Sequence, residues 1–119
     1  TITEVEVDIL ATHTWVGDLR FNLSHGGTNR NIIDRPGVPN SLFGCSGNNI
    51  DCTLDDDSGN PVENECALNP ALAGVLSPNQ SLGAFDGQDM AGNWTLTVSD
   101  NAGGDTGTLQ TWCLNITWQ

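Results

Sequence analysis

Lysine is absent from the sequence, and the only basic residues are Arg20, Arg30 and Arg35. Fifteen acidic residues leave a formal net charge of −12 at pH 7. A surface this acidic repels phosphate backbones and anionic membranes. We therefore expect no nucleic-acid partner and no role at a membrane surface. Solubility, cation binding or a partner with a basic patch is compatible with the charge.

Long apolar runs are also missing, so the sequence predicts no membrane span, and it shows neither a signal segment nor an initiator methionine. We expect a module excised from a larger secreted protein. Helical periodicity never persists beyond a turn or two. The length fits one domain, residues 1–119.

Alternation of apolar and polar residues predicts strands instead of helices. The predicted strands span residues 3–12, 19–24, 30–34, 94–99 and 111–118. Gly-rich turns separate several of these short strands, which favours an all-β fold: an antiparallel β-sandwich, jelly-roll-like.

The last two strands flank an acidic, Gly-rich loop from Asp100 to Gly107, which predicts a β-hairpin. Trp94 and Trp112 each lie on the apolar face of their strand. We expect both indoles to share one interior between the sheets and to be its largest stabilising contribution.

The middle of the chain, residues 35–81, holds all five prolines and three of the four cysteines. Prolines at this density exclude long helices and central strands. We expect long loops with short strands near 42–45 and 52–55, and a helical turn near 69–76.

The cysteines are Cys45, Cys52, Cys66 and Cys113, and no two have the close spacing of a zinc site. Disulfides are the better interpretation, and they indicate an oxidising compartment: secreted, periplasmic or cell-surface. Of the three possible pairings we favour Cys45–Cys52 with Cys66–Cys113.

Acidic loops provide the oxygen ligands that calcium prefers. One candidate loop is the triple-Asp run 55–57, and the other is the turn 100–105, with Asp86 or Asp89 folded alongside. Solvated acidic loops explain the same pattern. The candidate Ca²⁺ ligands are Asp55, Asp56, Asp57, Asp86, Asp100 and Asp105. For Asp18 we favour a turn carboxylate that accepts backbone N–H groups over a metal ligand.

Independent catalysis has little support in the sequence. The only histidines are His13 and His25, and no serine lies in a Gly-x-Ser-x-Gly elbow. We expect the chain not to be an enzyme by itself. Trp15 lies in a turn, where we favour a lid over the core, with sugar stacking or a protein contact as the alternative.

Motifs spread over the chain resemble the P domain (P/Homo B) of proprotein convertases and bacterial secreted proteases. They are Gly17-Asp18-Leu19, Gly27-Thr28, Phe85-x-Gly87, Gly92-x-Trp94-x-Leu96-x-Val98, Asp100 and Gly107-x-Leu109-x-x-Trp112-x-Leu114. The serine before His25 lacks the proline that commonly follows it in the family, and the middle segment is longer than in eukaryotic members.

This resemblance implies a jelly-roll β-sandwich that stabilises or regulates an adjoining secreted protease, often with calcium dependence. The expected partner is the catalytic domain of the same chain, a serine endopeptidase in preference to a metallopeptidase. The alternative is a free-standing, calcium-assisted module that binds carbohydrate or protein.

Overall fold

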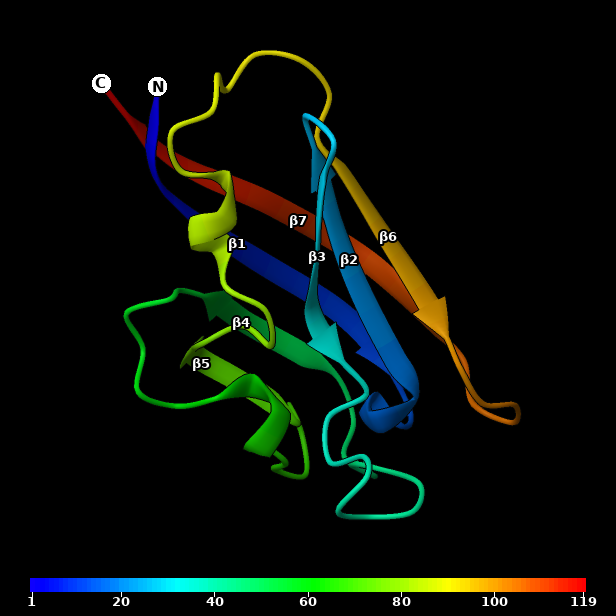
Figure 1. Cartoon of the computed structure of the whole chain (residues 1–119). Coiled ribbons are helices and arrows are strands. Elements are labelled where there is room, and N and C mark those ends of the chain that lie inside the picture. Colours follow the sequence, from blue (N-terminus) through cyan, green and yellow to red (C-terminus); the bar gives the residue numbers. More distant parts are fainter.

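The computed structural model describes all residues, 1–119, and confirms a β-sandwich of two sheets (Figure 1). The four-stranded sheet has the order β5 (Leu72–Leu76), β4 (Ile50–Leu54), β1 (Ile2–His13) and β7 (Gly107–Trp118). The three-stranded sheet has the order β3 (Thr28–Asp34), β2 (Leu19–His25) and β6 (Thr95–Asp100). Three 3-10 turns complete the fold: η1 (Val16–Asp18), η2 (Val62–Asn64) and η3 (Leu82–Phe85).

The central strands β1 and β2 follow the alternation of the sequence. Val5, Val7 and Ile9 of β1 are buried, while the acids between them keep contact with solvent. In β2 the buried positions alternate along the whole strand. Because each strand has one apolar face, the two sheets pack face to face around a shared core.

The core consists of aliphatic residues from the central strands together with two phenylalanines, Phe21 and Phe85, which are fully buried. Trp94 and Trp112 are only partly buried and pack against the margin of this core. Trp94 stacks on the His25 ring with a centroid separation of 3.9 Å. The expectation that both indoles lie within one shared interior between the sheets is therefore wrong in part, because both contact that core but only at its margin.

The predicted hairpin is also wrong. β6 pairs with β2 and β7 pairs with β1, so the two strands belong to different sheets. The loop between them is held by Asn101, whose backbone N–H donates to the Asp18 carbonyl at 2.8 Å. Asn101 and Asp18 are 83 positions apart in the sequence. Their contact holds the loop in which the chain passes from one sheet to the other.

The middle segment departs from expectation in two places. Residues 72–76 form β5, parallel to β4, where a helical turn is predicted. Residues 42–45 form no strand; Leu42 and Phe43 are 81% and 63% exposed. Instead, this segment packs its backbone against Gly17, whose N–H donates to the Cys45 carbonyl at 2.8 Å. A Cβ at Gly17 would collide with the Cys45 backbone nitrogen.

One disulfide, Cys45–Cys66, closes the middle loops, so the favoured pairing is wrong. Cys52 is buried on β4, and Cys113 is exposed on β7. Strand β1 lies between β4 and β7, with Ile9 opposite Cys52 and Asp8 opposite Cys113. The two free thiols therefore point to opposite faces of one sheet.

The two chain ends lie side by side (Figure 1). The Thr1 amino group donates to the Gln119 carbonyl at 2.9 Å, and the Gln119 N–H donates to the Thr1 carbonyl at 2.8 Å. The structure contains no helix with the length and apolar character that crossing a membrane requires.

Candidate cation site

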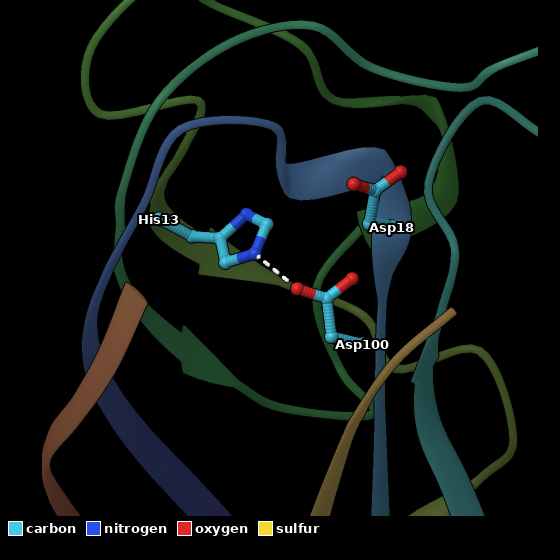
Figure 2. A group of neighbouring side chains, drawn as sticks. All are labelled: His13, Asp18 and Asp100. Carbon is cyan, nitrogen blue, oxygen red and sulfur yellow. Dashed lines mark hydrogen bonds and ion pairs between the residues drawn. The ribbon is translucent and has the colours of Figure 1, made fainter. Parts of the chain in front are cut away.

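Three side chains meet in one cluster (Figure 2). The cluster lies where β1 ends, away from the chain termini (Figure 1). His13 ends β1, Asp18 lies in η1 just before β2, and Asp100 ends β6. Their ligand atoms all lie within 4.8 Å of one another. His13 and Asp18 are buried, whereas the side chain of Asp100 keeps 35% exposure, so the cluster is reachable from solvent.

His13 is oriented by two hydrogen bonds. The Trp15 backbone N–H donates to its Nδ1 at 3.0 Å. Because Nδ1 accepts, the ring proton resides on Nε2, which donates to Oδ2 of Asp100 at 2.9 Å. This hydrogen bond lowers the pKa of Asp100 below its ordinary value. His13 thus fixes the Asp100 carboxylate and has no free lone pair on either nitrogen.

Asp18 has the least favourable surroundings in the cluster. Its residue exposure is 3%, and its Oδ2 is buried without a hydrogen-bond partner. No backbone N–H donates to this carboxylate, so the interpretation of Asp18 as a simple turn acceptor is wrong. Burial raises the pKa of Asp18, and the charges of Asp100 and Asp105 raise it further. An unpaired buried carboxylate is unfavourable by several kcal/mol in general.

Asp105 approaches the same place from the loop between β6 and β7. It lines an open hollow of about 390 Å³ together with Trp15, Asp18, Phe43, Ala102 and Gly103. One of its oxygens accepts the Thr14 hydroxyl at 2.8 Å. Trp15 also closes this region, because its indole N–H donates to the Phe43 carbonyl at 2.8 Å.

The other predicted calcium ligands lie elsewhere. Asp56 accepts the N–H groups of Leu82 and Gly83 at 2.9 and 2.8 Å and the Ser81 hydroxyl at 2.7 Å, so it holds the start of η3. Asp57 and Asp86 line a small hollow beside it. Desolvation and the neighbouring Asp56 raise the pKa of Asp86.

Asp55 does not line that hollow itself, although the neighbouring Glu4 does. Asp55 lies with Glu4 and Glu6 in a second group whose carboxylate oxygens are within 4.8 Å of one another. The structure therefore divides the six predicted ligands into three groups. Asp100 and Asp105 share one end of the sandwich, and the sequence interpretation missed the two buried partners there, His13 and Asp18. The signal for Asp18 is an acid placed between a glycine and the first apolar residue of a strand.

Neither histidine offers a nitrogen for base catalysis. Both nitrogens of His13 are engaged as described, and those of His25 face the carbonyls of Asn93 and Asp89 at 2.9 and 2.8 Å. A general base must accept a proton from its substrate within hydrogen-bond reach. Both histidine rings thus serve as hydrogen-bond partners within the fold.

Fold and site together define a disulfide-containing β-sandwich module with an acidic cluster where the chain crosses between sheets. Residues 64–116 match the family model of the proprotein convertase P-domain. This match confirms the resemblance over β5, η3, β6 and most of β7, a little under half of the chain. P domains are non-catalytic accessory domains of proprotein convertases. No curated protein and no solved structure matched the chain.

Proposed function

We propose that the whole chain is a P domain that stabilises or regulates an adjoining catalytic domain in one secreted protease. The family match over residues 64–116 carries this proposal. The disulfide Cys45–Cys66 supports an oxidising compartment outside the cytoplasm. The mechanism is non-catalytic: contact made only with the native catalytic domain shifts its folding equilibrium.

The surface best suited to this contact is the open seam, which we define as the inner faces of the edge strands β6 and β7. Both strands end their sheets, and a pocket of about 270 Å³ opens between them. The apolar residues along the seam are only partly covered: Leu96, Val98, Leu109, Trp112, Leu114 and Ile116.

The seam carries little charge, a property that it shares with the short edge strand β5. β7 contains no charged residue, and β6 contains one, Asp100 at its end, in a chain with fifteen acids. Uncharged apolar faces are typical of surfaces that another part of a protein covers. The occupant that we propose is a neighbouring part of the same parent polypeptide, because the P-domain likeness implies attachment to a catalytic domain.

The test compares the parent protease with a version that lacks residues 1–119. We expect deletion to lower the thermal midpoint and activity of the remaining catalytic domain. A sharper version places a charge in the seam with Val98→Lys, at a position 37% exposed in the isolated chain. Val75→Lys is the matched control, because Val75 is 52% exposed on β5, the opposite edge of the four-stranded sheet.

We expect both variants to fold as isolated chains. In the full parent, only Val98→Lys should lower the thermal midpoint of the catalytic domain. If the two variants behave alike in the parent, the seam is not the contact. If deletion of the whole module changes neither stability nor activity, the accessory role is wrong.

A further inference from the structure

Asp18 and Asp100, with Asp105 in the hollow beside Asp18, have the features of an ion site, and we infer that they bind one calcium ion. The site belongs to the chain itself and does not depend on the proposed protease partner. The first observation is geometric: ligand atoms of Asp18 and Asp100 lie within 4.8 Å of each other. Calcium binds oxygens at about 2.3–2.6 Å, so two of its ligands lie up to about 5 Å apart.

The second observation is a carboxylate oxygen of Asp18 that has no partner. Oδ2 of Asp18 is buried without any hydrogen-bond partner, on a residue with 3% exposure. Figure 2 shows one oxygen of this carboxylate on the side that faces the His13 ring, and an Asp18 oxygen lies within 4.8 Å of the ligand atoms of His13 and Asp100. A buried carboxylate without a partner is unfavourable, and a cation at this position supplies the missing partner.

The donor set selects the kind of ion. The Trp15 N–H occupies Nδ1 of His13, and Nε2 donates its proton to Asp100. His13 is therefore not available as a nitrogen ligand and instead orients Asp100. The remaining donors are carboxylate oxygens, which suit hard cations such as Ca²⁺, whereas zinc favours sites with nitrogen or sulfur ligands.

At this position the ion connects two segments in which the chain crosses between the sheets. Asp18 lies in the crossing from β1 to β2, and Asp105 lies in the crossing from β6 to β7. The Asp18 carbonyl already accepts two hydrogen bonds from Asn101, one from its backbone and one from its side chain, at 2.8 and 3.1 Å. A bound cation adds a second connection between the two crossings and removes the repulsion among three acids. It stabilises the folded chain because the unfolded chain does not hold these groups together.

The test is a Ca²⁺ titration of the 119-residue chain followed by its thermal midpoint. We expect a rise of about 5–10 °C at roughly 10 mM Ca²⁺, with the affinity of extracellular calcium modules. Asp18→Asn should weaken Ca²⁺ binding at least tenfold, and Mg²⁺ and Zn²⁺ should give smaller shifts with the unmodified chain.

Two control variants remove one acid each from other places. Asp51→Asn neutralises an exposed acid on β4, and Asp57→Asn neutralises an acid of the triple-Asp loop. Both should keep the calcium response of the unmodified chain. Loss of the response in Asp57→Asn, an unchanged response in Asp18→Asn, or no response in the unmodified chain would overturn the inference.

A spectroscopic probe locates the ion independently of stability. Trp15 lines the hollow that contains Asp18 and Asp105, so Tb³⁺ bound there should emit when the indole is excited, and Ca²⁺ should quench the emission by displacement. Trp15→Phe should abolish this emission while keeping the Ca²⁺-dependent thermal shift. Full emission from Trp15→Phe would place the ion elsewhere and overturn the assignment.

Discussion

Glu63 should make the stability of the folded chain depend on pH, and one substitution should remove this dependence. Glu63 lies in η2 with its side chain half-buried, and its Oε2 accepts the Asp34 N–H at 3.0 Å. Burial raises the pKa of Glu63 from 4.5 to about 7, and the Asp34 charge adds to the rise, while the hydrogen bond from the Asp34 backbone opposes it. The Asp34 carboxylate is itself paired with Arg20 at 2.7 Å.

The direction in which stability changes with pH follows from proton binding. Between about pH 4.5 and 7 the folded chain holds a proton on Glu63 that the unfolded chain has released. This contribution to stability is present at pH 4.5 and is lost as the pH rises through 7. The full pKa difference corresponds to about 3 kcal/mol, at about 1.4 kcal/mol for each tenfold change in proton affinity. Because solvent reaches the side chain, we expect about 1–2 kcal/mol.

Glu63→Gln should remove this loss, because the amide stays neutral and its oxygen still accepts the Asp34 N–H. Urea unfolding should show equal stabilities for the variant and the unmodified chain near pH 4.5. At pH 8 the variant should be more stable by about 1–2 kcal/mol. Glu65→Gln is the control, since it removes the same charge from a carboxylate that accepts no hydrogen bond. Parallel pH profiles for Glu63→Gln and the unmodified chain would refute the reasoning.

Three other changes test the fold by urea unfolding. Asp56→Ala should cost about 1–2 kcal/mol, since it leaves the backbone at the start of η3 without its acceptor; an unchanged midpoint would contradict this role. Trp94→Ala should cost about 2–4 kcal/mol through lost contact with His25 and Phe85, whereas a cost below about 1 kcal/mol would show that the indole is peripheral. Replacing both Cys45 and Cys66 by Ser should cost about 3 kcal/mol, and equal stability with and without reductant would argue against the bond.

The strands with one buried face were predictable from the sequence. β2 alternates along its whole length and β1 does so from Val5 to His13, so most of their buried residues follow from position alone. β5 was not predictable in this way. Leu72 and Leu76, its buried residues, are four positions apart, and this spacing puts them on one face of a helix as readily as on one face of a strand.

Pairing between strands was harder to predict than the strands themselves. The runs that form β6 and β7 alternate well, and the turn between them has the residues of a hairpin loop. Their separation into two sheets depends on contacts of Asn101 with Asp18, which sequence patterns do not reveal. The candidate cation site was hard to predict for the same reason, because His13 and Asp100 are 87 positions apart in the sequence.

The closeness of Thr1 and Gln119 has a consequence for how this fold can be built into larger proteins. A polypeptide enters and leaves the sandwich at one point, so a host can accept it within a surface loop without separating the two sides of that loop. The same geometry permits circular permutation, with a short peptide joining the old ends and new ends opened at the exposed Gly59.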